Sequence, residues 1–178
     1  IRNGVRTKRE GYRADLFFGE AMAFIDESRD QPFFCYLAYN TPHSPFQVPD
    51  RYFDMYKDRV TEGDSALKIM NASVYGMVRN IDDNVGKLRS YLKAEGLADN
   101  TIFIFTTDNG SSSGWRTFNA GMRAGKGSEY DGGHRVPFIV RWPARVKPGV
   151  SDAMVNQVDL LASLASLLDI ELADDEAR

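Results

Sequence analysis

The chain has 178 residues, of which 22 are Lys or Arg and 25 are Asp or Glu, giving a formal net charge of −3. This length allows one domain or a large part of one, and the near balance of charge offers no basic surface for nucleic acid or an anionic membrane. The sequence contains no apolar run of about 18 residues, so it predicts no membrane span.

Apolar residues in the first part of the chain recur at helical spacing and then form a continuous run. Over residues 14–25 they repeat at steps of three and four, which predicts an amphipathic helix. The segment FFCYLAY, residues 33–39, is apolar or aromatic throughout, which predicts an interior strand covered on both faces. Its lone cysteine, Cys35, is then expected to be a small buried side chain.

A long helix, two more strands and a final helix are predicted in the rest of the chain. Residues 65–95 carry an apolar stripe at helical spacing, and Gly96 supplies a stop signal. The segments at 101–107 and 136–142 repeat the pattern of a buried strand, and residues 155–170 return to helical spacing. Helices that alternate with covered strands predict an α/β layer fold.

The connection between the last two predicted strands is long and rich in glycine and serine. It reads DNGSSSGWRTFNAGMRAGKGSEYDGGHR, residues 108–135, and its length indicates either a functional or a disordered segment. Its aromatic and charged residues favour a functional one.

Polar side chains follow two of the predicted strands. His43 comes four residues after the segment 33–39, and Asp108 and Asn109 follow the segment 101–107 directly. Ligands of open α/β sheets bind beyond the carboxyl ends of strands, so these side chains share one face if the two strands run parallel. The alternatives are a proline-rigidified turn with a solvent-exposed His43, and a plain Asp-Asn-Gly turn.

The carboxylate of Asp108 and the amide carbonyl of Asn109 are hard oxygen ligands. They suit calcium or magnesium, with calcium the first choice. Calcium takes about six to eight oxygens, and no other carboxylate cluster in the sequence has suitable spacing. Asp82 and Asp83 lie within the predicted long helix, where they are expected to form a solvated face. The sequence therefore predicts half of a metal site.

Four segments in order resemble the middle and later catalytic-domain segments of the sulfatase family. They are QPFFCYLAYNTPHSPFQVP, YGMVRNIDDNVGKLRSYLKAEGLADNTIFIFTTDNG, GKGSEYDGGHRVPFIVRWPARV and VDLLASLASLLDI. The family includes arylsulfatases and glycan sulfatases and lies within the alkaline-phosphatase-like superfamily. The resemblance extends from about Tyr12 to Ile170, and it implies an α/β fold class in which the chain forms part of an alkaline-phosphatase-like sheet flanked by helices.

The resemblance also implies sulfuric ester hydrolysis. In the family, a cysteine or serine of a C/S-x-P-S-R motif is oxidised to formylglycine, whose hydrate attacks sulfur while calcium polarises the sulfate oxygens. By their positions in the motifs, Asp108 and Asn109 match calcium ligands, His43 matches a histidine at the sulfate or leaving group, and Lys126 matches a lysine that contacts sulfate. A protonated His43 can donate to a developing alkoxide.

Other polar residues of the same loops receive no catalytic role. Without the resemblance, Lys126 would itself be interpreted as a solvated loop lysine. The glycines around it let the backbone approach a ligand closely, and its ammonium is a compact charge suited to a sulfate oxygen. His134 and Arg135, next to the last predicted strand, are expected to have structural or supporting roles.

Some parts of the family pattern do not occur in this sequence. It contains no C/S-x-P-S-R motif, since Cys35 is followed by Tyr-Leu-Ala-Tyr. The family's opening aspartate pair, a further lysine and histidine pair and its small C-terminal subdomain are also missing. We therefore expect residues 1–178 to be the later portion of a sulfatase catalytic domain, inactive in isolation, with formylglycine in a missing upstream part. The parent protein is expected to be extracytoplasmic, either periplasmic or secreted.

Two alternative functions remain beside hydrolysis of an aryl or carbohydrate sulfate. One is a related phosphate or phosphonate ester hydrolase, because a metal and a lysine serve a phosphoryl group equally well. The other is a non-catalytic binding domain of the same fold. An upstream C/S-x-P-S-R motif would indicate sulfate, whereas a threonine or serine outside that context would favour phosphate. The loops at 45–64 and 111–124 are expected to shape the substrate pocket.

Overall fold

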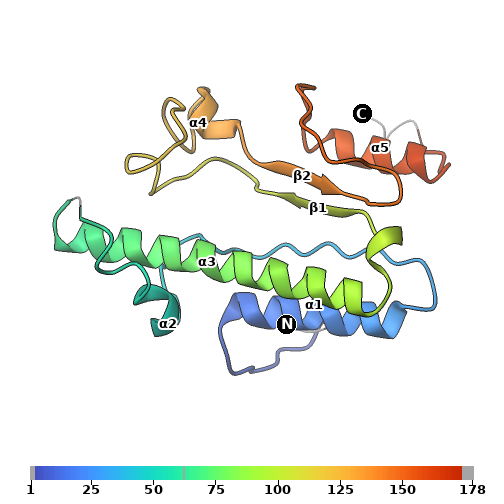
Figure 1. Cartoon of the computed structure of the whole chain (residues 1–178), viewed down its shortest axis with the longest axis horizontal. Coiled ribbons are helices and arrows are strands. Elements are labelled where there is room, and N and C mark those ends of the chain that lie inside the picture. Colours follow the sequence, from blue (N-terminus) through green and yellow to red (C-terminus); the bar gives the residue numbers. More distant parts are fainter. Residues whose placement is uncertain (1–2, 62, 174–178) are drawn as a thin grey trace. The chain divides into compact units, whose positions relative to one another are not determined.

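The computed structural model describes residues 3–61 and 63–173, and the chain divides into two units, Ile1–Val146 and Lys147–Arg178. The elements of the first unit, in chain order, are α1 (Arg13–Ser28), α2 (Asp50–Phe53), α3 (Ser65–Ala94), the 3-10 helix η1 (Ala98–Asn100), β1 (Phe103–Thr106), α4 (Asp131–His134) and β2 (Phe138–Arg141) (Figure 1). The second unit contains α5 (Asp159–Leu167).

Helix α3 begins and ends at signals that are local in the sequence. The side chain of Asp64 accepts a hydrogen bond of 2.9 Å from the N–H of Leu67, which satisfies a donor that the first turn leaves unpaired. At the other end Gly96 has a φ of 71°, and the N–H of Leu97 donates to the carbonyl oxygen of Leu92 over 2.9 Å. This is the Schellman arrangement that glycine favours. The predicted helix over 65–95 and its glycine stop are confirmed.

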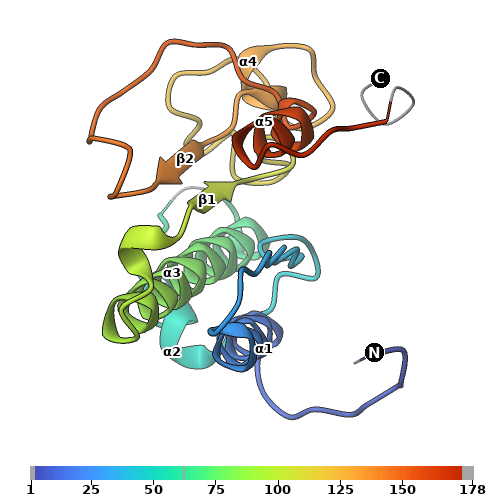
Figure 2. The same ribbon diagram turned by 90° about the vertical axis from the view of Figure 1, so that its right-hand side faces the viewer.

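Helices α1 and α3 pack side by side and run in the same direction. Asp15, near the start of α1, accepts a hydrogen bond of 2.7 Å from the side chain of Asn80, whereas Arg29, just after α1, pairs with Glu95 just after α3. Figure 2, which views both helices nearly end-on, shows them next to each other. The buried core where α1, α3 and η1 meet comprises Phe18, Ile25, Leu88, Leu92 and Ala98. Full burial of a Phe, Ile or Leu side chain contributes about 1.5–3 kcal/mol to the stability of the fold.

The segment at residues 33–39 is extended and lies along this helix pair (Figure 1). Phe33, Leu37 and Tyr39 pack against the core, and the ring centroids of Tyr39 and Phe18 lie 5.3 Å apart. These three residues are separated by two or four positions, which is the spacing of side chains on one face of an extended chain. The segment therefore returns the chain along α1 and α3 and leads to His43.

The opposite face of this segment is open, which corrects two predictions. Phe34 and Tyr36 are 74% and 81% exposed, and the segment pairs with no strand among residues 3–61 and 63–173. The prediction of an interior strand covered on both faces is therefore wrong for this structure. Cys35 was expected to be buried and is exposed, because it is not among the residues of the segment that pack against the core.

Strands β1 and β2 form an antiparallel pair in which Phe103 lies opposite Arg141 and Thr106 opposite Phe138. The end of β1 therefore lies beside the start of β2. The long connection between the strands begins and finishes at this one end of the strand pair. The connection carries α4 (Figure 2). Both strands are confirmed, although each is shorter than its predicted segment. The predicted burial of the second strand is wrong, since Ile139 and Val140 of β2 are 57% and 40% exposed.

The second unit is built around α5. Its first turn is tied by a hydrogen bond of 2.7 Å from the N–H of Asn156 to the carboxylate of Asp159, and the helix is shorter than the predicted residues 155–170. Within the part of the chain that the structure describes, no helix is long and apolar enough to cross a membrane.

Candidate functional site

Asp108 and Asn109 lie in the turn that directly follows β1. Asp108 is exposed and Asn109 is partly buried. The chain bends at these two residues, and the hydroxyl of Thr107 donates to the backbone carbonyl of Asn109 over 3.4 Å. The two predicted metal ligands therefore lie at the end of the strand pair where β1 ends and β2 begins.

The next residue, Gly110, is in close backbone contact with α4. Its N–H donates to the carbonyl oxygen of Gly133 over 2.9 Å. A Cβ atom at Gly110 would lie 1.9 Å from the carbonyl oxygen of Gly132, closer than any real contact of a Cβ atom. Only glycine permits this approach. The backbone at the start of the long connection therefore packs directly against the backbone of α4 near the end of the connection.

Lys126 is held beside the same turn by its main chain. Its N–H donates to the carbonyl oxygen of Ser111 over 3.0 Å. The preceding Gly125 is buried, and a Cβ atom there would lie 2.6 Å from the same Ser111 oxygen. The side chain of Lys126 is exposed. The fold thus brings the backbone of Lys126 next to the Asp108–Asn109 turn, although Lys126 lies 16 positions after Gly110 in the sequence.

His43 lies in a separate turn. Its N–H donates to the carbonyl oxygen of Asn40 over 2.7 Å, and its Nδ1 lies 2.9 Å from the carbonyl oxygen of Ser44. The flanking Thr41–Pro42 and Ser44–Pro45 peptide bonds are cis, and the imidazole is exposed. Among the described residues, no hydrogen bond or ion pair joins His43 to the connection after β1. Its assignment to the same site stays a prediction.

The donor chemistry of Asp108 and Asn109 fits a hard cation. A carboxylate and an amide carbonyl on consecutive exposed or half-exposed positions supply two oxygen ligands of the kind that calcium prefers. Within residues 3–61 and 63–173, no group of three or more His, Cys, Asp or Glu side chains could hold a metal ion. The assignment of Asp108 and Asn109 as calcium ligands therefore stays a prediction.

The other polar residues considered above have structural contacts. Asp83 accepts a hydrogen bond of 3.0 Å from the hydroxyl of Tyr52 and pairs with Arg79 at 2.8 Å, which ties α2 to α3. Asp82 is solvated, with 75% of its side chain exposed. Arg135 pairs with Asp131 on α4 at 3.5 Å.

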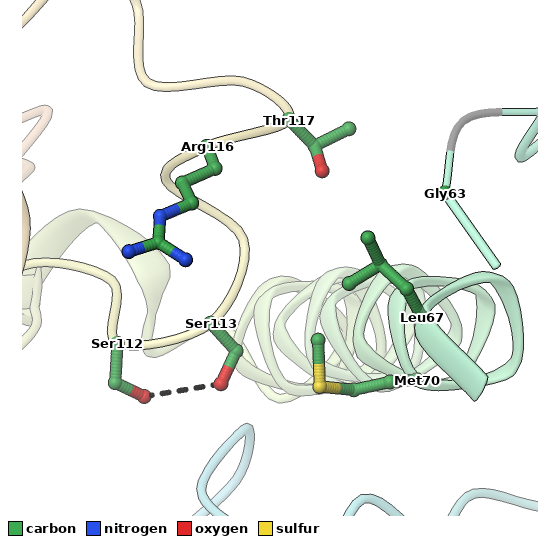
Figure 3. Close-up of a pocket in the computed structure, with 7 residues that line it drawn as sticks. All are labelled: Gly63, Leu67, Met70, Ser112, Ser113, Arg116 and Thr117. Carbon is green, nitrogen blue, oxygen red and sulfur yellow. Dashed lines mark hydrogen bonds between the residues drawn. The ribbon is translucent and has the colours of Figure 1, made fainter.

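A cavity of about 460 Å³ adjoins the start of the same connection (Figure 3). Its lining residues are Gly63, Leu67, Met70, Ser112, Ser113, Arg116 and Thr117. They come from the end of the loop at 45–64, from the first turns of α3 and from the loop at 111–124. Sequence reasoning did not identify Arg116, because nothing in the local pattern distinguishes it from any loop arginine.

Comparison with known proteins gives consistent relatives. A model described as Sulfatase matches residues 2–170. The chain is 36% identical over 92% of its length to N-acetylgalactosamine-6-O-sulfatase of Bacteroides thetaiotaomicron. It is 34% identical over 79% of its length to arylsulfatase A of Homo sapiens.

A solved structure agrees with these relatives. The crystal structure of Ps i-CgsB in complex with k-i-k-neocarrahexaose is 34% identical in sequence and superposes with a TM-score of 0.85 over 98% of this chain. The chain covers 32% and 26% of the two curated relatives and 38% of the Ps i-CgsB chain. It therefore spans about a third of the length of the proteins it matches.

Proposed function

Because the chain belongs to the sulfatase family and has the α/β fold of its members, we propose that the protein hydrolyses sulfate esters, with aryl or carbohydrate sulfates as substrates. The main support is the hydrogen bond of 3.0 Å from the backbone N–H of Lys126 to the carbonyl oxygen of Ser111, which holds the backbone of Lys126 beside the Asp108–Asn109 turn and leaves its side chain exposed. The names of the relatives, a galactosamine sulfatase and an arylsulfatase, favour sulfate over phosphate. Residues 1–178 would then form the later portion of the catalytic domain.

Lys126 and His43 would act on different parts of the ester. The ammonium of Lys126 would contact a sulfate oxygen and stabilise the negative charge there. The imidazole of His43 would donate its proton to the oxygen of the leaving alcohol as that oxygen gains charge. Both side chains are exposed, so a substrate can reach them without unfolding of the core.

Asp108 and Asn109 would hold calcium, together with ligands from outside the described residues. Bound calcium would polarise the sulfate oxygens and neutralise part of their charge. The 178 residues contain no C/S-x-P-S-R motif, so no residue of this chain is assigned as the formylglycine nucleophile. By family resemblance, the proposed compartment is periplasmic or extracellular.

The test is an assay of the protein, expressed from its complete coding sequence, with nitrophenyl sulfate, nitrophenyl phosphate and a 6-sulfated galactosamine in the presence of calcium. Lys126→Ala should lower kcat/KM for both sulfates by a factor of about 10² or more. Lys87→Ala, at an exposed position on α3, is the matched control and should change it by less than a few-fold.

Two outcomes of this assay would favour the alternatives. Faster turnover of the phosphate than of either sulfate would identify a phosphate ester hydrolase. Binding of sulfated sugar without turnover of any ester would identify a non-catalytic binding domain.

A further inference from the structure

The cavity at the start of α3 has the size of a ligand site and a single charged lining residue. Its volume of about 460 Å³ falls in the range of about 300–1,000 Å³ that is typical of small-molecule sites. Arg116 is the only charged residue among the seven that line it, and none of the seven is acidic. The only charged group among the lining residues is therefore a cation.

The guanidinium of Arg116 is available to a ligand. Its Cζ lies 5.1 Å from the centroid of the Trp115 ring, which is within the range of a cation–π contact. No carboxylate of the described residues forms an ion pair with it. A planar fork of N–H donors without a carboxylate partner matches the geometry of a sulfate or carboxylate.

Hydroxyl groups line the cavity together with Arg116. The Oγ atoms of Ser112 and Ser113 lie 3.4 Å apart (Figure 3). The hydroxyl of Thr117 accepts a hydrogen bond of 3.0 Å from the side chain of Asn71, so its own proton can be donated to a ligand. Asn71 is only 2% exposed, which fixes the position of Thr117 relative to α3. These groups add hydrogen-bond donors for an oxyanion.

The remaining lining residues give the cavity an apolar side. Leu67 and Met70 lie on the first turns of α3 and take part in the lining (Figure 3). Pockets that combine apolar surface with a few placed polar groups are typical of sites for organic ligands. A sugar ring, with its C–H face and its polar substituents, fits this combination better than a free inorganic ion does.

The cavity is close to the proposed sulfate site. Ser112 follows Asp108 by four residues, so the Cα atoms of the two are at most about 14 Å apart. We propose that the cavity around Arg116 binds an oxyanion substituent, either a sulfate or a carboxylate, on a sugar next to the one that loses its sulfate. This inference rests on the proposed sulfatase function, and it identifies the substrate class as an oligosaccharide with more than one negative charge.

The experiment uses the full-length protein and three oligosaccharides with the same sulfated sugar and a neutral, carboxylated or sulfated neighbour. Arg116→Gln should lower kcat/KM for the charged oligosaccharides by about tenfold or more relative to the neutral one, because a hydrogen-bonded charge is lost. The charged oligosaccharide with the larger loss identifies the natural substituent. An equal loss with all three would overturn the proposal.

Arg89→Gln is the matched control, because Arg89 lines a separate depression of about 310 Å³ with Lys93 and Arg141. It should leave the relative kcat/KM values of the three substrates unchanged. An effect as large as that of Arg116→Gln would indicate general attraction of anions and would overturn the assignment to this cavity.

A binding measurement separates this inference from the proposed function. By calorimetry, a carboxylated oligosaccharide without any sulfate should bind the wild-type protein about tenfold more tightly than Arg116→Gln. Absence of sulfate ester turnover together with this difference would refute the proposed function and leave the anion site in place. Equal dissociation constants would refute the anion site, whatever the turnover.

Discussion

The carbonyl oxygen of Ser111 accepts a hydrogen bond of 3.0 Å from the backbone N–H of Lys126. The position of Lys126 beside the Asp108–Asn109 turn therefore depends on main-chain contacts, and its exposed side chain takes no part in them. Changes at the glycines of the connection should disturb the site through the backbone, whereas changes at Lys126 should affect chemistry alone.

Gly110→Ala should destabilise the protein and lower its activity. The new Cβ atom would meet the carbonyl oxygen of Gly132 at 1.9 Å, so the turn or α4 must move, at a cost of about 1–3 kcal/mol. Gly19→Ala, in the interior of α1 with no atom within 4 Å of its Cβ position, is the matched control. It should stabilise by up to about 1 kcal/mol through helix propensity. Chemical denaturation measures both, and equal stability of Gly110→Ala and wild type would contradict the contact.

His43→Ala and Lys126→Ala should differ in their dependence on the leaving group. Loss of His43 should slow alkyl or sugar sulfates by about 10²–10⁴ and nitrophenyl sulfate much less, because a phenolate departs with little help from an acid. Loss of Lys126 should slow all sulfates similarly, because the sulfate is common to them. Both residues are exposed, so stability should change by about 0.5 kcal/mol or less. Steady-state kinetics and thermal melts check this, and a sharp fall in melting temperature would place His43 in a structural turn.

Asp15→Ala should be among the most destabilising polar substitutions in the first unit. The carboxylate accepts hydrogen bonds of 2.7 Å from the side chains of both Asn80 and Asn84, and both asparagines are buried. Each amide left without this acceptor costs about 1–3 kcal/mol. Asp15→Asn keeps an acceptor oxygen and should lose less, while Asp82→Ala on the solvated face of α3 should be nearly neutral. Urea unfolding ranks the three, and Asp15→Ala matching Asp82→Ala would show that the network contributes little.

Calcium affinity should depend on Asp108 and on residues beyond this chain. The 178-residue chain alone should bind calcium weakly, because Asp108 and Asn109 leave most of its coordination shell to water. In the complete protein, Asp108→Ala should weaken calcium binding by about tenfold or more, and Asp82→Ala should not. Calorimetry measures both proteins. A submicromolar calcium site in the 178-residue chain would reveal ligands that the described residues do not show.

Cys35 should react slowly with alkylating agents although it is exposed. Partial burial raises the pKa of its thiol, so less thiolate forms at a given pH than for an ordinary cysteine. At any given pH, the fraction of Cys35 present as thiolate should be smaller than that of a free cysteine. The rate of iodoacetamide modification against pH, read by mass spectrometry at this single cysteine, checks the direction. A rate that reaches its midpoint at or below that of free cysteine would reverse it.

The sequence by itself determined the elements whose signals are local. Helix α3 could be predicted with its end at Gly96, because the apolar stripe and the hydrogen bonds of the terminal turn involve residues only a few positions apart. The α/β class followed from the same periodicities. The family resemblance, and with it Asp108, Asn109, Lys126 and His43 as site residues, also came from the sequence, and their roles remain predictions.

Only the tertiary structure decided which distant residues meet. An apolar run such as residues 33–39 does not specify what covers it, and one of its faces lies open. Likewise, the antiparallel register of β1 and β2, the contact of Gly110 with Gly133 and the cavity around Arg116 join residues that are far apart in the chain. Such pairings are selected by packing and by backbone hydrogen bonds across long loops, and the local pattern of a single segment carries no signal for them.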